Sequence, residues 1–151
     1  MATDTAKSSV NILLIEDDAA DQKLIKSMVE KQPIDCRLGF ARSAEEAFAA
    51  LRTGEKADNG AKTTDLIILD LNMPGMGGRE FLRQIKADPK LKQIPVVILT
   101  SSTSETDILD SYQLQAAGFL TKPAGLTQLE GIINGILEYW LVLCRLPARE
   151  C

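Results

Sequence analysis

Short apolar runs alternate with longer stretches of mixed polarity along this chain. Leu66–Leu69 is an unbroken apolar run that follows Asp65 and ends at Asp70, just before turn-forming residues. A short apolar run bounded by turn signals is typical of a strand buried on both faces of a parallel sheet. Strands are predicted at Asn11–Glu16, Asp35–Ala41, Leu66–Leu69, Ile94–Leu99 and Phe119–Lys122.

The stretches between these runs have the apolar spacing and the end signals of helices. Pro33 stops the first helix, and Ser43 with Glu46 forms a capping-box pattern at the start of the second. Helices are predicted over Asp21–Gln32, onward from Ser43, from the Pro74–Gly78 loop to Ala87, over Glu105–Ala117 with Gly118 as its terminator, and over Leu126–Cys144.

Strands that alternate with helices of this length indicate right-handed βαβ units. We therefore predict an α/β fold with a doubly wound, five-stranded parallel sheet and helices on both faces. A single domain is expected over residues 10–146, between a flexible N-terminal tail at 1–9 and a C-terminal tail at 147–151. The polar segment Gly54–Thr64 is expected to be a long solvated loop.

Composition narrows the class of protein. The 151 residues are 45% apolar and 25% charged, which is ordinary for a soluble globular domain. The net charge of −4, without a basic stripe, argues against nucleic-acid binding. No signal peptide and no apolar run of transmembrane length is recognisable, and the odd number of cysteines favours free thiols. We therefore expect a cytoplasmic protein without a membrane partner.

The chain contains no histidine, which excludes imidazole chemistry and histidine metal ligation. A bound metal must then be held by oxygen atoms, which favours Mg²⁺, Mn²⁺ or Ca²⁺ over zinc.

Polar residues follow four of the predicted strands, namely Glu16 with Asp17, then Asp70, Thr100 and Lys122. The carboxyl ends of the strands of a doubly wound sheet gather at one edge. Carboxylates gathered there repel one another unless a cation lies among them, and Mg²⁺ would relieve the repulsion. Asp70 is then the natural nucleophile toward phosphorus. Mg²⁺, the Lys122 ammonium and the Thr100 hydroxyl could each neutralise one phosphoryl oxygen.

The order Glu16-Asp17, Asp70, Thr100 and Lys122-Pro123 resembles the receiver domain of two-component response regulators, a flavodoxin-like fold. Thr100 lies 30 residues after Asp70, and Lys122 lies 22 residues after Thr100, which fits that family. The resemblance is closest to the small stand-alone regulators paired with phytochromes. Ser111-Tyr112 and Tyr139-Trp140-Leu141 carry that part of it.

The resemblance implies that Asp70 accepts a phosphoryl group from a phosphohistidine on a sensor histidine kinase, here a phytochrome. Glu16, Asp17, Asp70 and the backbone carbonyl of Asn72 would hold Mg²⁺, with Mn²⁺ as a substitute. The resemblance also implies that Lys122 and Thr100 stabilise the phosphoryl group and that Thr100 and Phe119 form the switch pair. It further implies a cis peptide bond between Lys122 and Pro123.

Two other functions remain open from the residues. An aspartyl-phosphate phosphatase would use the same nucleophile, hydroxyl, lysine and Mg²⁺, but it needs a second Asp where Asn72 stands. A binding module with a silent acidic pocket would take up no phosphoryl group. The response regulator hypothesis predicts no enzymatic activity beyond the protein's own phosphorylation and dephosphorylation.

The last predicted helix has more apolar residues than one sheet face can cover. We therefore expect a homodimer through this helix and the tail, with Leu126, Tyr139, Trp140, Leu143 and Leu146 at the interface. Gly131 and Gly135 suggest a close backbone approach on the same helix. Because no output module is expected after this helix, signalling is expected to proceed by protein contact.

Overall fold

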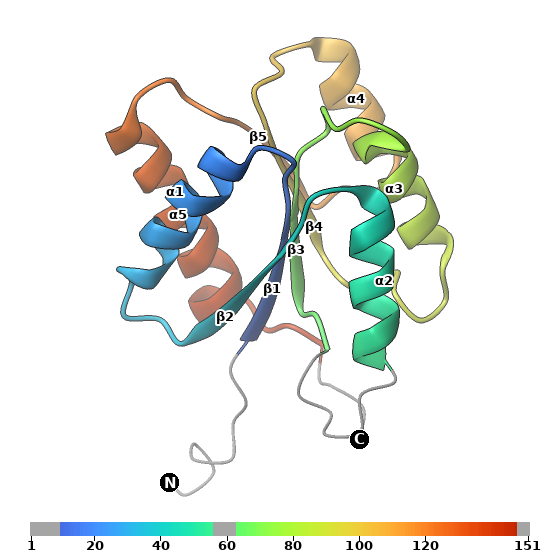
Figure 1. Cartoon of the computed structure of the whole chain (residues 1–151), viewed down its shortest axis with the longest axis horizontal. Helices are drawn as coiled ribbons and strands as arrows, with labels where there is room; N and C mark the ends of the chain where they lie inside the picture. The colour runs from blue at the N-terminus through green and yellow to red at the C-terminus, as the bar shows by residue number, and fades with distance from the viewer. Residues whose placement is uncertain (1–9, 56–62, 148–151) are drawn as a thin grey trace, which may run out of the picture.

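A computed structural model describes residues 10–55 and 63–147. In this part of the chain five parallel strands form one sheet in the order β2-β1-β3-β4-β5 (Figure 1). The strands are β1 (Val10–Ile15), β2 (Cys36–Ala41), β3 (Leu66–Leu69), β4 (Val96–Thr100) and β5 (Gly118–Thr121). The predicted fold is confirmed. The predicted 1–9 tail, residues 148–151 of the other tail and most of the predicted loop lie outside the described residues.

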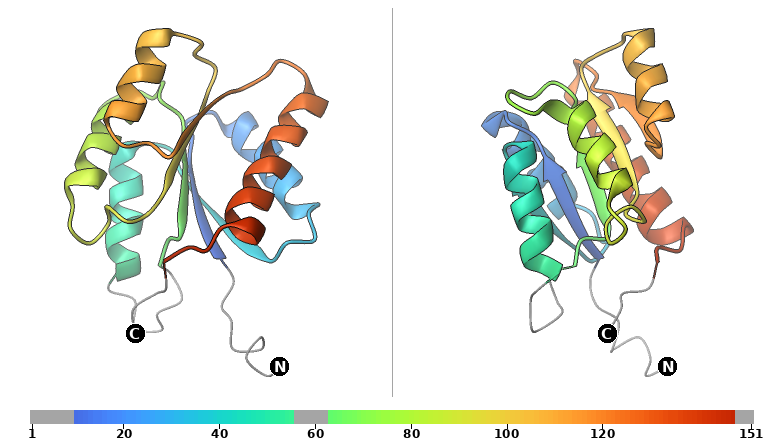
Figure 2. Two further views of the ribbon diagram at one scale, coloured as in Figure 1. Left: turned by 180° about the vertical axis from the view of Figure 1, so that it is seen from behind. Right: turned by 90° about the vertical axis from the view of Figure 1, so that its right-hand side faces the viewer.

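Helices cover both faces of the sheet. Helices α1 and α5 lie on one face, and α2, α3 and α4 lie on the other (Figures 1 and 2). Their bounds are α1 (Ala19–Glu30), α2 (Ala44–Glu55), α3 (Gly77–Ala87), α4 (Glu105–Gln113) and α5 (Leu126–Leu137), followed by a π-helical segment, η2 (Glu138–Leu143).

The strand register brings the carboxyl ends of the strands to one edge of the sheet. Ile15 pairs with Leu69, and Thr100 pairs with Thr121. One residue further on, the Asp70 N–H donates to the Ile15 carbonyl at 3.0 Å. The Lys122 N–H likewise donates to the Thr100 carbonyl at 2.7 Å. The residues that follow the strands therefore lie at the same edge.

The sheet separates two apolar cores, and β3 is buried throughout, as its apolar run predicts. On the face covered by α2 and α3, Phe48 packs against Phe81 with ring centroids 4.8 Å apart. On the other face, Ile25 of α1 and Ile133 of α5 are buried against the same strands. The apolar contact on both faces holds the strand ends in a fixed arrangement.

The helix starts follow the local capping signals. Asp18 caps α1, where its carboxylate accepts from the Ala20 N–H at 2.8 Å. The Ser43 hydroxyl accepts from the Glu46 N–H at 3.1 Å, and the Glu46 carboxylate accepts from the Arg42 N–H. The capping box predicted at Ser43 is confirmed, with the acid bonded one residue earlier than in the usual pattern.

Several predicted helix ends are wrong. α4 stops at Gln113 because Gln115 adopts a left-handed conformation with φ of 76°, while Gly118 begins β5. α2 continues through Gly54 to Glu55, so the predicted loop begins later. The predicted last helix changes at Glu138 from α-helical to π-helical hydrogen bonding.

The structure bears on two expectations about the C-terminal third. The described residues contain no cis peptide bond, so the predicted cis Lys122–Pro123 bond is wrong. The trans form is the lower in energy, and Lys122 reaches the strand-end carboxylates without the cis bond. Gly131 and Gly135 have no atom within 4 Å of an added Cβ, so the described part of the chain does not approach them closely.

Within the described residues, no helix has both the length and the apolar character needed to span a membrane. Cys36 and Cys144 are free thiols, as predicted, and Cys151 lies outside the described residues.

Candidate functional site

Three carboxylates meet where β1 and β3 end. Glu16, Asp17 and Asp70 each offer one oxygen, and these oxygens lie within 4.8 Å of one another. Glu16 and Asp70 are buried, with 2% and 7% of their surface exposed, whereas Asp17 is exposed. The chain extends the sheet from β1 toward β2 on one side and from β3 toward β5 on the other, so β1 and β3 flank the topological switch point. Open α/β sheets bind ligands at such a point. The polar residues at the strand ends predict this cluster, and the structure brings its members together.

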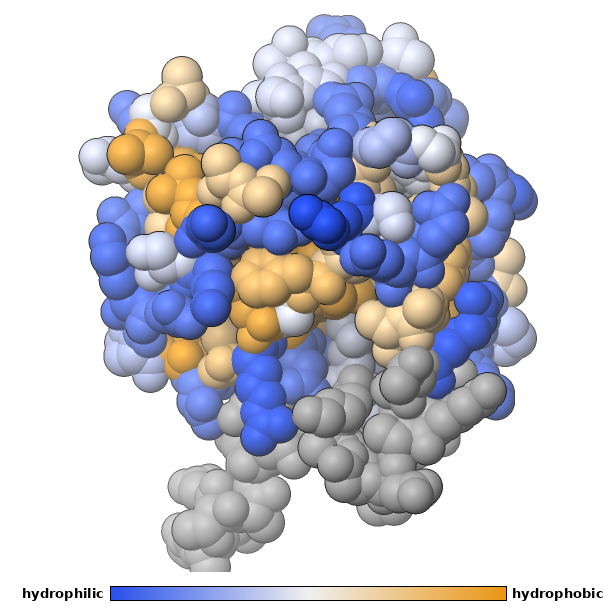
Figure 3. All heavy atoms as spheres, viewed as in Figure 1, coloured by the Kyte–Doolittle hydropathy of each residue, from blue (hydrophilic) through white to orange (hydrophobic). Residues whose placement is uncertain are grey.

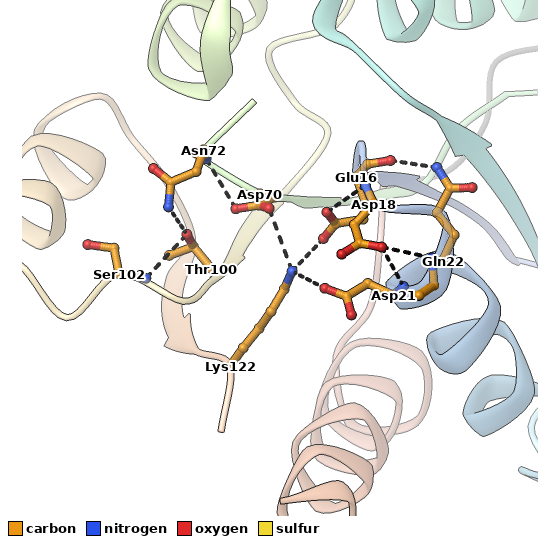
Figure 4. Close-up of polar contacts among 10 residues, drawn as sticks. Glu16, Asp18, Asp21, Gln22, Asp70, Asn72, Thr100, Ser102 and Lys122 are labelled. Carbon is orange, nitrogen blue, oxygen red and sulfur yellow. Dashed lines mark hydrogen bonds and ion pairs between the residues drawn. The ribbon is translucent and has the colours of Figure 1, made fainter. Parts of the chain in front are cut away.

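Lys122 extends from the end of β5 into this cluster (Figure 4). Its Nζ donates to Glu16 Oε1 at 2.5 Å and to Asp21 Oδ2 at 2.9 Å, and lies 3.6 Å from Asp70 Oδ2. The Lys122 side chain is 13% exposed, so these contacts form in a partly desolvated environment. The lysine is therefore directed at the carboxylates, as predicted, and is not a solvated surface charge.

Burial and neighbouring charge change the protonation of this site. Burial raises the pKa of Glu16 to about 7; the Lys122 hydrogen bond opposes this shift and the charge of Asp70 adds to it. Burial alone would lower the pKa of Lys122, but its hydrogen bonds to Glu16 and Asp21 and the charge of Asp70 raise it instead. The ammonium consequently stays charged, and Glu16 is the group poised to exchange a proton near neutral pH.

A hydroxyl and an amide lie on the other side of Asp70 (Figure 4). Thr100 is fully buried, and its Oγ1 accepts from Asn72 Nδ2 at 3.3 Å and from the Ser102 N–H at 3.5 Å. The Asn72 N–H donates to Asp70 Oδ1 at 3.1 Å. Thr100 is thus connected to the acidic strand end through Asn72.

The other predicted switch residue, Phe119, lies in β5 opposite Ile98. It is half-buried and packs against the core that contains Phe81. Its side chain belongs to the α3 and α4 side of the sheet.

Two site residues of α1 were not predicted from the sequence. Asp21 contacts Lys122, and Gln22 donates from its side-chain amide to the Glu16 carbonyl at 2.5 Å. Both lie in the first turn of the helix that follows the acidic strand end. That location was the available signal, but acidic residues are common in first turns, where the helix dipole favours them.

The donor set fits a hard divalent cation. The cluster consists of carboxylate oxygens, which are the ligands that Mg²⁺ and Mn²⁺ take in proteins. Asn72, whose backbone carbonyl was predicted as a further ligand, lies three residues after the end of β3. A bound cation would also offset the repulsion between Glu16 and Asp70.

Comparison with known proteins identifies the family. The sequence model described as "Response regulator receiver domain" matches residues 12–134. The chain belongs to the response regulator receiver domain family. It is 41% identical over 137 residues to the response regulator Rcp1 of Synechocystis sp., covering 91% of this chain and 92% of Rcp1. Receiver domains bind Mg²⁺ at an acidic pocket, and they act in two-component signalling with a histidine kinase as partner.

Solved receiver structures have the same fold. The phosphorylated cyanobacterial phytochrome response regulator RcpA is 42% identical, with a TM-score of 0.85, covering 93% of this chain and all of that one. The Mn²⁺-bound form of Rcp1 is 40% identical with a TM-score of 0.83, covering 92% of this chain and 99% of that one. Receiver-domain response regulators are generally signalling proteins without enzymatic activity.

Proposed function

We propose that Asp70 is the phosphoacceptor of this receiver domain and that the chain is a phosphorylation switch in a two-component phosphorelay. The supporting observation is the convergence on Asp70. Two further carboxylates lie within 4.8 Å, the Lys122 ammonium lies at 3.6 Å, and Asn72 links the site to Thr100. Four separate segments of the chain contribute these groups.

In the proposed reaction an Asp70 carboxylate oxygen forms a bond to phosphorus. The bond between phosphorus and the imidazole nitrogen of the kinase's phosphohistidine breaks, and its electron pair returns to that nitrogen. The Lys122 ammonium then neutralises one phosphoryl oxygen, and the Thr100 hydroxyl donates to another. Mg²⁺ held by Glu16, Asp17, Asp70 and the Asn72 carbonyl supplies the remaining charge neutralisation when it is bound.

Thr100 and Phe119 form the proposed switch pair. The Thr100 hydroxyl is within reach of Asn72 rather than of Asp70, so it would have to move toward a phosphoryl group. Phe119 lies on the strand beside β4 and would follow that movement. Two alternative arrangements of one packed element are the usual form of such switches.

Incubation with acetyl phosphate and Mg²⁺ followed by intact mass measurement tests the proposal. We expect one added phosphoryl group, lost in Asp70→Asn and retained in Asp110→Asn, which removes a carboxylate from α4. An adduct that survives in Asp70→Asn, or no adduct in the wild type, would refute the assignment.

We propose no turnover of exogenous phosphate esters, because Asn72 occupies the position where a phosphatase of this chemistry needs an acid. An amide cannot donate a proton as a carboxylic acid does. Steady release of phosphate from an ester such as p-nitrophenyl phosphate would favour the phosphatase instead. A site that takes up no phosphoryl group at all would favour the silent binding module.

The proposed phosphodonor is a phytochrome-type histidine kinase in the cytoplasm. The name of the phytochrome response regulator RcpA, which is 42% identical, supports this pairing. Label transfer from a phosphorylated phytochrome kinase, compared with transfer from an unrelated histidine kinase, tests it. Equal or faster transfer from the unrelated kinase would contradict it.

We also propose a homodimer through α5, η2 and the segment that follows, with residues 10–146 as the folded unit. Leu126, Tyr139 and Leu143 are 62%, 52% and 67% exposed, and Figure 3 shows apolar surface where α5 begins. Leu126 lies at the beginning of α5 and Leu143 at the end of η2, so the interface would run along the whole helix. Trp140 is partly buried against the core and stacks edge-on with Tyr139, and Leu146 is half-buried.

A further inference from the structure

The Lys122 ammonium lies nearer to helix α1 than to the proposed phosphoacceptor. Its Nζ is 2.9 Å from Asp21 Oδ2 and 3.6 Å from Asp70 Oδ2 (Figure 4). The first distance is that of a charge-assisted hydrogen bond, whereas the second is beyond hydrogen-bond range. The ammonium is therefore displaced toward α1.

Asp21 stands apart from the cluster that fits a cation. The carboxylate oxygens that meet at the end of β1 and β3 come from Glu16, Asp17 and Asp70. Asp21 approaches Lys122 from the first turn of α1, a helix whose start is fixed by the Asp18 cap. Its side chain is 35% exposed, so water can solvate the carboxylate when the lysine leaves. A partly exposed carboxylate can release the ammonium at modest cost.

We propose that Asp21 is a positioning residue that holds the Lys122 ammonium on the α1 side of the site and competes for it with a phosphoryl group on Asp70. This inference rests on the proposed function. An ammonium has three N–H donors, and Glu16 and Asp21 already accept two of them at short distance. In this proposal a phosphoryl oxygen on Asp70 takes the third donor and draws Nζ toward Asp70, which lengthens the contact with Asp21. Removal of Asp21 then makes the lysine more available to the phosphoryl group.

Beryllofluoride, which occupies the position of a phosphoryl group on a carboxylate without forming a covalent phosphate, measures this competition. The half-saturating beryllofluoride concentration would be determined by NMR at a Mg²⁺ concentration that saturates each variant. We expect Asp21→Asn to lower it by about threefold, the scale of one partly exposed ion pair.

Two control variants distinguish the loss of the Asp21–Lys122 contact from the loss of one negative charge at the start of α1. Asp18→Asn removes the same charge from the same helix start, keeps a good capping side chain and does not remove a Lys122 contact. We expect it to shift the half-saturating concentration by less than about 1.5-fold, because exposed charges without contact are screened. Asp21→Glu keeps the carboxylate within reach and should stay near the wild-type value.

The lysine itself supplies a readout that a merely structural role of Asp21 would not change. The side-chain ammonium resonance of Lys122, assigned by its loss in Lys122→Arg, should shift in metal-free Asp21→Asn and remain unchanged in metal-free Asp18→Asn. Addition of beryllofluoride with Mg²⁺ should shift it in the wild type.

An equal effect of Asp18→Asn and Asp21→Asn, weaker beryllofluoride binding in Asp21→Asn, or an unchanged Lys122 resonance would overturn the inference. If the wild type binds beryllofluoride and Asp70→Asn does not, these outcomes refute only the proposed role of Asp21 and leave the proposed function standing. Failure of the wild type to bind, or equal binding by Asp70→Asn, would overturn the proposed function, and the Asp21 inference with it.

Discussion

At the scale of single residues, Glu16 is a buried carboxylate whose charge near neutral pH depends on its surroundings. Burial raises its pKa to about 7, well above the ordinary 4.5, so its proton is held more tightly in the folded protein than in the unfolded chain. Below that pH the protonated form predominates, and a metal ion that binds to Glu16 must displace the proton. Metal binding and proton release are therefore linked at this residue.

We predict that Mg²⁺ affinity falls as the pH falls through neutrality. Because Mg²⁺ must displace one proton from a group with a pKa near 7, the apparent Mg²⁺ dissociation constant should be about tenfold larger at about pH 6 than at about pH 8. Isothermal titration calorimetry with Mg²⁺ measures it, and buffers of different ionisation enthalpy count the protons released. Glu16→Gln should remove most of this pH dependence; an unchanged slope in that variant would assign the proton to another group.

The structure explains why position 78 is a glycine. An added Cβ would lie 2.7 Å from the Asp70 carbonyl oxygen and 2.7 Å from the Leu71 Cα. Both contacts are to backbone atoms, which cannot move aside as a flexible side chain does. Glycine at 78 thus allows α3 to start directly against the segment that carries Asp70.

We predict opposite stability effects for two glycine substitutions. Gly78→Ala should lower the free energy of unfolding by about 1–3 kcal/mol, the usual cost of overpacking a tight site. Gly131→Ala, on an exposed part of α5 with no atom within 4 Å, should raise it by up to about 1 kcal/mol through helix propensity. Urea unfolding measures both, and a destabilised Gly131→Ala would indicate a contact that the single chain does not show.

At the scale of elements, the C-terminal helix carries the least explained surface. The apolar residues of α5 that face the sheet are buried, but Val142 and Leu143 of η2 are 58% and 67% exposed. Helix α4 also exposes Leu109, at 57%. Exposure alone does not distinguish these two surfaces as interfaces, so the homodimer proposal needs a test that compares them.

We predict that Leu143→Glu converts a dimer to a monomer and that Leu109→Glu does not. The two substitutions add the same charge at similarly exposed leucines, so they differ only in the surface they change. Sedimentation velocity at tens of micromolar protein measures the effect. A monomeric wild type at that concentration would refute the dimer, and an effect of Leu109→Glu alone would assign the interface to α4.

At the scale of the whole molecule, the site joins parts of the chain that are far apart in sequence. Lys122 and Glu16 are separated by 106 residues and meet because β5 and β1 end at the same edge of one sheet. The two buried cores hold these strands from both sides. A cation bound among Glu16, Asp17 and Asp70 therefore ties β1 to β3 and should stabilise the entire fold.

We predict that Mg²⁺ raises the melting temperature. At a concentration about a hundredfold above the dissociation constant, linkage adds about 2.7 kcal/mol, which corresponds to about 5–10 °C for a domain of this size. Differential scanning calorimetry with and without Mg²⁺ measures the shift. Asp17→Asn should reduce it strongly, whereas Asp88→Asn, on the loop after α3, should leave it intact. An equal shift in both variants would contradict the assignment of the cluster.

Local sequence patterns were sufficient to predict the strands, their alternation with helices and the polar residues at the strand ends. Apolar runs and caps such as Asp18 and Ser43 act locally, and the carboxyl ends of parallel strands share one edge whatever the details of packing. Packing in the folded chain was needed to place Lys122 against Asp21, to end α4 at Gln113 rather than at Ala117, and to give Pro123 a trans bond. These features depend on which distant groups compete for the Lys122 ammonium and on how backbone segments pack. A local sequence pattern contains neither kind of information.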